Sequence, residues 1–156
     1  MVPTALLPSK PFAEAKSQLS GVMNEVVRGH HPQVVDRHSG KEAMLLMGLD
    51  ELQALLEPFE FHAHVSVSDG EFVVRLAELN LIAGGSSYEE ALDELANLVE
   101  AYAEEFLERT DFYMQTDRRE HLPWLLRFAL TPAEERADLL ARVPPSRLKE
   151  GAAQPA

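Results

Sequence analysis

A single long amphipathic helix is the feature of this 156-residue sequence that most limits its fold. The segment Ser87-Tyr-Glu-Glu90 has the pattern of a capping box, in which the serine hydroxyl and the glutamate carboxylate each satisfy a backbone amide at the start of a helix. Apolar residues then recur at spacings of three and four, namely Leu92, Leu95, Val99, Tyr102 and Phe106. This periodicity predicts a helix that ends near Arg109.

The other face of this helix is rich in glutamate, with Glu89, Glu90, Glu94, Glu100, Glu104 and Glu105. We interpret it as a solvated face, and paired carboxylates for catalysis are the alternative. No serine or histidine arrangement indicates a nucleophile. We therefore predict that the protein is not an enzyme, and we identify no catalytic residue, metal site or cofactor.

Short strands precede the helix. Residues 61–67 alternate in polarity, Asp69-Gly70 has the composition of a tight turn, and residues 72–77 and 81–83 are predicted as the next strands. Gly84-Gly85-Ser-Ser before the helix is interpreted as a strand-to-helix turn, because it lacks the lysine and the glycine spacing of a phosphate-binding loop.

Two histidines of the first of these strands, His62 and His64, lie on one predicted strand face. Structural or solvent-facing histidines are the favoured interpretation. A metal-binding strand edge is the alternative, but no third ligand is indicated nearby.

The segment after the long helix is less regular. Residues 111–114 are predicted as a fourth strand or a loop, and residues 121–130 as a short helix. Thr131-Pro-Ala-Glu134 has the pattern of a second capping box, which predicts a helix to about Val143. Residues 144–156 are rich in Pro, Ala and charge and are expected to be disordered.

The N-terminal part predicts a strand, a helix, two strands and a second helix. Val2–Leu7 is the first expected strand, and Ser9 is expected to cap a helix with Pro11 in its first turn. The apolar stripe of this helix comprises Phe12, Ala15, Leu19, Val22, Met23 and Val26. Residues 32–37 and 42–47 flank a glycine-containing turn as a hairpin, and residues 49–57 form a short helix.

Charge is distributed unevenly along the chain. Residues 1–57 hold five Lys/Arg against seven Asp/Glu, and the remainder holds nine against 19, within a total net charge of -12. Such acidity argues against a general nucleic-acid coat, because phosphate binding depends on Lys and Arg, but it allows a local basic site. The absence of cysteine and of any long apolar run predicts a cytoplasmic protein without membrane contact.

A basic turn, DRHSGK, stands out in the less acidic part. Arg37, His38 and Lys41 bracket the predicted hairpin tip, and Lys16 lies off the apolar stripe of the first helix. These residues are either solubilising surface charges or a small binding site.

Several motifs between Phe12 and Glu57 resemble, in this order, the N-terminal domain of Phd/YefM antitoxins over about residues 2–57. They are Glu14-Ala15-Lys16, Leu19-Ser20, Val34-Val35-Asp36-Arg37, Gly40, Ala43-Met44-Leu45-Leu46-Met47 and Asp50-Glu51-Leu52. The resemblance implies a β-α-β-β-α domain that forms a homodimer, or a higher even oligomer, and binds the operator DNA of its own operon.

In that family a basic residue of the first helix and the arginine before the hairpin turn contact DNA. These roles carry over to Lys16, which stands where arginine is usual, and to Arg37. His38, Ser39 and Lys41 are added because of their position in the turn. The residues expected to form the core and the dimer interface together are Leu19, Val22, Met23, Met44 and Leu46.

The second half resembles HicB-like antitoxin domains over about residues 59–110. The motifs are Asp69-Gly70-x-Phe72-Val-Val, Leu76-Ala-Glu-Leu79 and Gly85-Ser-Ser-x-Glu-Glu-Ala-Leu92. The resemblance implies a small antiparallel sheet packed on the long helix, a fold with which HicB proteins cover the active site of a toxin. An acidic domain suits a basic ribonuclease toxin, because opposite potentials speed the encounter.

We therefore expect an α+β protein with a dimerising, DNA-binding domain over residues 1–57. A toxin-binding domain with a helical extension follows over residues 58–143, and residues 144–156 form a tail. The expected function is that of a type II antitoxin that neutralises its cognate toxin and represses its own operon. A protein-interaction or inhibitor module without DNA binding is the alternative, and whether the sheet or residues 111–143 contact the toxin stays open.

Overall fold

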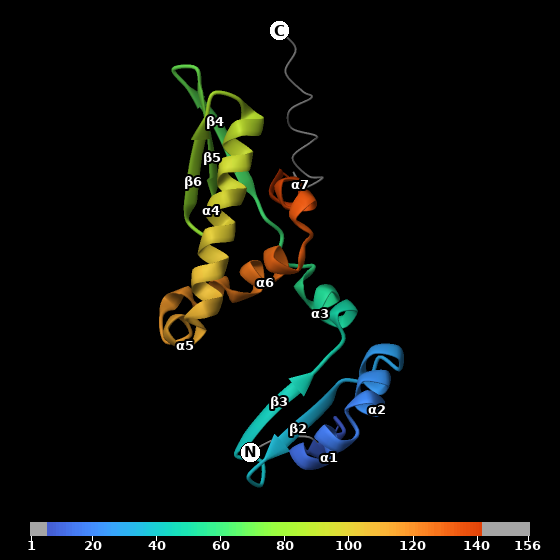
Figure 1. Ribbon diagram of the computed structural model, residues 1–156. Coiled ribbons are helices and arrows are strands. Elements are labelled where there is room, and N and C mark those ends of the chain that lie inside the picture. The colour runs from blue at the N-terminus through green and yellow to red at the C-terminus, as the bar shows by residue number, and fades with distance from the viewer. Residues whose placement is uncertain (1–5, 142–156) are drawn as a thin grey trace. The chain divides into compact units, whose positions relative to one another are not determined.

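A computed structural model describes residues 6–141 and divides the chain into two compact units, one ending at Leu55 and the next beginning at Leu56 (Figure 1). Within the described residues the fold is α+β, with one three-stranded sheet in each unit. The boundary expected between residues 57 and 58 lies two residues after the one observed between Leu55 and Leu56. The tail expected over residues 144–156 lies outside the described residues.

The sheet of the first unit has the strand order β1-β2-β3. β1 (Ser9–Pro11) runs parallel to β2 (Gln33–Arg37), and β2 is antiparallel to β3 (Glu42–Leu46). The register places Val35 opposite Met44 and Arg37 opposite Glu42. The predicted hairpin is thus confirmed.

The start of the chain differs from the prediction. Of the expected strand Val2–Leu7, residues 1–5 lie outside the described part, and Leu6 and Leu7 form a bend rather than a strand. Ser9 does not cap a helix, because it belongs to β1 and its hydroxyl donates to Asp36 Oδ2 at 2.8 Å. Pro11 occupies the N-cap position instead, without a side-chain cap bond.

The helix predicted after β1 is divided into three segments: α1 (Phe12–Ser17), α2 (Leu19–Met23) and the π-helical η1 (Asn24–Arg28). The break falls at Gln18, whose φ of -115° and ψ of 26° are not helical. Ser17 lies beside it and donates its hydroxyl to the Glu14 carbonyl at 2.9 Å, which competes with regular helical bonding. α3 (Leu49–Leu56) follows the hairpin as predicted.

A small core joins these helices to the hairpin. Ala15, Val22 and Val26 pack against Val35 of β2, and Leu46 of β3 lies partly buried against them. Figure 1 shows α1 and α2 on one side of the β2–β3 hairpin. Few residues are fully enclosed, so much of the apolar surface of this unit stays accessible.

The sheet of the second unit is an antiparallel meander in the order β4-β5-β6. It comprises β4 (Ala63–Ser68), β5 (Glu71–Leu76) and β6 (Leu81–Gly85). Asp69 and Gly70 join the first two strands with φ angles of 52° and 82°, the left-handed pair that a two-residue hairpin favours.

The long predicted helix is α4 (Tyr88–Glu108). Its first turn is capped by Ser87, whose hydroxyl accepts from the Glu90 amide at 3.1 Å. The Glu90 carboxylate accepts from the hydroxyl and the amide of Ser86, so the reciprocal bond of the capping box is displaced by one residue. These two bonds lower the pKa of Glu90.

The chain beyond α4 is more helical than predicted. It forms α5 (Thr110–Tyr113), η2 (Asp117–His121), α6 (Leu122–Leu130), η3 (Ala133–Glu135) and α7 (Arg136–Ala141). The predicted strand or loop at residues 111–114 is mostly helical, since Tyr113 stacks on Phe106 of α4 with ring centroids 4.7 Å apart. The prediction of a second capping box at Thr131 is wrong, because the Thr131 hydroxyl donates to the Arg127 carbonyl instead.

The core of the second unit is built on the apolar stripe of α4. Leu95, Val99 and Phe106 are fully buried, and they belong to one cluster with Val74 and Leu76 of β5. Residues of α6 and α7, namely Leu125, Phe128, Leu139 and Leu140, complete the cluster. α4 packs mainly on β6 and less on β5, lying along one face of the sheet (Figure 1).

Gly85 allows α4 to approach β6 closely. A Cβ at Gly85 would lie 2.6 Å from the Ala91 amide nitrogen, whereas one at Gly84 would meet only the Phe72 carbonyl oxygen, at 3.7 Å. We therefore predict that Gly85→Ala destabilises the second unit by about 1–3 kcal/mol, and that the matched control Gly84→Ala costs less than about 1 kcal/mol. Urea unfolding followed by fluorescence of Trp124, the single tryptophan, measures both. Equal effects would contradict the close packing.

Candidate functional site

The basic turn forms the tip of the β2–β3 hairpin. Gly40 has the predicted positive φ, 82°, but His38 and Ser39 are also left-handed, with φ angles of 53° and 57°. The Lys41 amide closes the turn by donating to the His38 carbonyl at 3.3 Å. Two non-glycine residues in this region are uncommon, and such strain is found at functional positions more often than elsewhere.

Arg37 is the last residue of β2, and its guanidinium Nε pairs with the Glu42 carboxylate directly across the hairpin. Both side chains are more than half exposed, so the pair contributes little to stability. Sequence analysis did not anticipate Glu42, although a four-residue turn from His38 to Lys41 places residues 37 and 42 opposite each other. The positive charge of Arg37 is therefore already balanced by the Glu42 carboxylate.

The other predicted DNA-binding residues are exposed near this tip or on α1. His38, Ser39 and Lys41 are adjacent in the turn, and Lys16 lies in the last turn of α1. Phe12, at the start of α1, lines the same groove as Arg37. The structure thus places three of the five residues in the turn, Arg37 directly before it at the end of β2, and Lys16 on α1.

A shallow groove of about 220 Å³ is formed by paired residues of β2 and β3 together with Phe12 of α1. Its apolar lining includes Phe12 and Met44, which are 43% and 50% exposed. The full lining is Phe12, Val35, Asp36, Arg37, Glu42, Ala43 and Met44.

The five residues expected for core and dimer divide into two groups. Val22 is buried in the core and Leu46 packs against it, whereas Leu19, Met23 and Met44 are exposed. The exposed group leaves an apolar surface on this unit.

The second unit holds a polar cavity of about 480 Å³ lined by Leu79, Asn80, Leu81, Tyr102, Asp117, Arg118, Glu120 and His121. Tyr102 Oη and His121 Nδ1 lie 2.7 Å apart, and the Arg118 guanidinium lies 5.8 Å from the Tyr102 ring centroid. Burial raises the pKa of Tyr102. Burial and the nearby Arg118 lower the pKa of His121.

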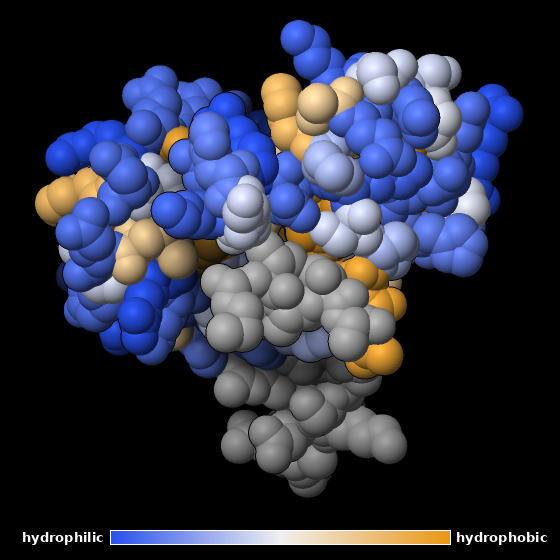
Figure 2. Space-filling model, turned by 90° about the horizontal axis from the view of Figure 1, so that it is seen from below, coloured by the Kyte–Doolittle hydropathy of each residue, from blue (hydrophilic) through white to orange (hydrophobic). Residues whose placement is uncertain are grey.

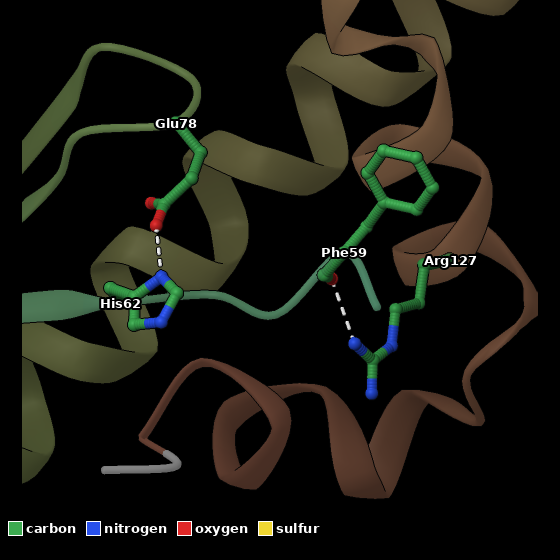
Figure 3. A network of polar contacts seen from close by, with 4 residues as sticks. All are labelled: Phe59, His62, Glu78 and Arg127. Atoms are coloured by element: carbon green, nitrogen blue, oxygen red, sulfur yellow. Dashed lines mark hydrogen bonds and ion pairs between the residues drawn. The ribbon is translucent and has the colours of Figure 1, made fainter. Parts of the chain in front are cut away.

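The segment between α3 and β4 is held by α6. Figure 3 shows Arg127 reaching the Phe59 carbonyl, at 2.7 Å, and the same nitrogen, Nη1, donates to the Glu57 carbonyl at 2.9 Å. Trp124 of α6 packs edge-on against the Phe59 ring, with centroids 5.0 Å apart. These contacts give residues around Trp124 a part in closing the second unit.

The two strand histidines are placed differently from each other. His62 precedes β4, and its Nδ1 lies 2.6 Å from the Glu78 carboxylate (Figure 3), whereas His64 lies within β4. Among residues 6–141, no group of three or more His, Asp or Glu side chains is arranged to hold a metal ion.

The visible surface is largely hydrophilic, with a few separate hydrophobic patches (Figure 2). None of the helices described is long and apolar enough to cross a membrane.

Comparison with known proteins identifies the class. A PHD-like family model, described as an antitoxin of toxin–antitoxin, RelE/RelB, TA system, matches residues 6–141. Proteins of this class are antitoxins, which regulate rather than catalyse, so the prediction that the chain is not an enzyme is confirmed. The match spans both units, and the chain belongs to this antitoxin family.

A solved structure supports the same fold. The chain is similar to a crystal structure of an antitoxin part of a proposed toxin/antitoxin system from Syntrophomonas wolfei subsp. wolfei, with a TM-score of 0.75 and 22% identity. The match covers 85% of this chain and 96% of the other. The comparison with curated proteins gave no match.

We predict that His121 makes the second unit less stable in acid. Its pKa is lower in the folded chain than the ordinary value of 6.5, so stability is lost as the pH falls below about 6.5 and towards the folded pKa. His121→Asn should therefore reduce the fall in melting temperature between pH 7.5 and pH 5.5, as followed by Trp124 fluorescence. The control His38→Asn lies in the other unit and should leave this dependence unchanged, and an unaltered profile in His121→Asn would refute the assignment.

Proposed function

We propose that this antitoxin has two separate binding functions. The first unit would dimerise and bind the operator of its own operon, as in Phd/YefM proteins, and the second, HicB-like unit would bind and neutralise the cognate toxin, a basic ribonuclease. Both partners would be met in the cytoplasm. The observation that carries the proposal is the division of the chain into two compact units of different charge.

The DNA-binding function is supported by the hairpin tip. Arg37 and Lys41 are exposed at one end of a two-stranded element, and the tip is held in an unusual left-handed conformation. A two-stranded β-ribbon fits the major groove, and arginine is the usual contact to guanine there. The element order of the first unit also supports the proposal, because one strand, three helical segments, two strands and a helix follow one another.

The homodimer is supported by the exposed apolar surface of the first unit. Met44 is half exposed on β3, which is an edge strand of the sheet formed by the described residues, and Leu19 and Met23 are exposed on α2. A two-fold axis there would cover these side chains and present two basic tips to a palindromic site.

Toxin binding is supported by the charge of the second unit. Residues 56–141 contain six Lys/Arg and 19 Asp/Glu. This excess of carboxylates would attract a basic ribonuclease over a distance and mimic RNA phosphates at its surface.

An interaction module without DNA binding is the second candidate. The pairing of Arg37 with Glu42, together with Asp36 beside it, favours this candidate because both carboxylates would repel DNA phosphates.

One substitution separates the two functions. We expect Arg37→Ala to weaken binding to the DNA upstream of the chain's own reading frame about tenfold, because a guanidinium contact is lost. Neutralisation of the protein encoded by the adjacent frame, measured as rescued growth on co-expression, should be unchanged. Gel shift at fixed salt compares Arg37→Ala with Arg28→Ala, an exposed arginine on η1 that serves as the control.

The outcomes distinguish the candidates. No operator shift by the unaltered chain, with growth rescued, would support the interaction module. Absence of both effects would contradict the whole proposal.

The dimer has its own test. Met44→Lys should convert a dimeric chain to a monomer without unfolding it, since the side chain is 50% exposed in the single chain. Light scattering after gel filtration measures the mass. Leu49→Lys, at an exposed position on α3, is the control and should remain dimeric. A dimer that survives Met44→Lys would exclude this edge as the interface.

A further inference from the structure

β4 is an edge strand of the sheet that the described residues form. β4 is the first strand in the order β4-β5-β6, and within residues 6–141 no strand pairs with its other side. Its six residues pair with β5 in an unbroken register from Ala63↔Leu76 to Ser68↔Glu71, without a bulge. A regular, unpaired edge presents a row of backbone donors and acceptors to which another strand can bond.

The side chains of β4 are also accessible. Val65 and Val67 are 47% and 60% exposed, although their register partners on the same face include Val74, which is completely buried. Val65 and Val67 are more exposed than Val74 because α4 packs over β5 and β6, whereas β4 lies outside its main contact area. Two adjacent apolar side chains thus border the open edge.

β4 lacks the features that protect edge strands. Natural edges carry lysine, proline or a bulge that prevents pairing with another chain. The strand Ala-His-Val-Ser-Val-Ser has neither lysine nor proline. The opposite edge strand, β6, differs because α4 covers it and because Gly85 is packed against the helix backbone.

Charge selects among the partners that β4 could accept. The unit that carries β4 holds 19 Asp/Glu against six Lys/Arg over residues 56–141. A second copy of this unit would bring the same negative excess to the edge, and like-charge juxtaposition opposes association. A strand from a basic protein would be attracted instead.

We propose that β4 is the docking strand for a basic protein, which adds a strand of its own to the sheet and places apolar side chains against Val65 and Val67. The inference rests on the proposed function in one respect: the basic protein is the cognate toxin. Backbone bonds along β4 would supply affinity, and the two valines and the acidic surroundings would select the partner.

The experiment uses the full chain and the purified protein encoded by the adjacent reading frame. Val67→Lys should raise the dissociation constant at least about tenfold, since it removes an apolar contact and places a lysine on the edge. Ile82→Lys, on β6, is the matched control, because Ile82 is 56% exposed and the charge change is the same. It should alter the constant less than about twofold.

Two further measurements separate pairing from simple charge attraction. Val67→Glu adds a negative charge yet should also weaken binding, whereas attraction by charge alone would strengthen it. Hydrogen exchange should show increased protection of the β4 amides that point away from β5, which alternate along residues 63–68, and no change over residues 81–85. Circular dichroism confirms that each variant is folded.

The outcomes are distinct. Binding by the unaltered chain that withstands Val67→Lys, or that leaves the β4 amides that point away from β5 unprotected, would overturn β4 docking and leave the proposed function standing. Equal weakening by Val67→Lys and Ile82→Lys would also overturn it. A dimer of the isolated chain that Val67→Lys dissociates would show that a second copy occupies the edge. No binding by the unaltered chain would refute the proposed function itself.

Discussion

Burial of the apolar stripe of α4 is the interaction on which the second unit depends. A 21-residue helix with a glutamate-rich outer face gains most of its stability from the surface that it buries, since most helical stability in proteins comes from the packing of an amphipathic face. Leu95, Val99 and Phe106 supply that surface, and β5 and β6 receive it. Gly85 sets the distance between helix and strand, because a side chain there would collide with the helix backbone.

The first unit has a much smaller buried core than the second. Among the described residues its core cluster is small, with Ala15, Val22, Val26, Val35 and part of Leu46, and several larger apolar side chains remain accessible. A domain of this size buries too little surface to be very stable alone, and association is one common remedy. The accessible side chains therefore matter both for stability and for the proposed dimer.

Sequence patterns predicted the elements that local chemistry determines. The cap at Ser87, the period of α4 and the Asp69-Gly70 turn each depend on neighbouring residues, and all three are observed. The alternation along β4 could be read in the same way. It did not reveal that Val65 and Val67 border an open edge, because coverage depends on the strand order and on where α4 lies.

The incorrect predictions from the sequence have their causes in the tertiary structure. Phe112 and Tyr113 favour strands, but the stacking of Tyr113 on Phe106 fixes a helical turn there. Thr131 has the composition of a cap, yet its hydroxyl bonds backwards to Arg127. The contact between Tyr102 and His121, 19 residues apart, requires the chain to reverse after α4. At the candidate site, the exposure of Arg37 followed from its place beside a turn, whereas its pairing with Glu42 required the register of the hairpin.

The bonds from Arg127 to the Glu57 and Phe59 carbonyls have a consequence for folding during synthesis. They join residues separated by 70 and 68 positions, so the segment that leads into β4 cannot be fixed until α6 has left the ribosome. The first unit can complete its own contacts well before that, because domains fold as units during synthesis. A nascent chain that stops short of α6 would hence display a finished first unit followed by a sheet whose leading segment is still untethered.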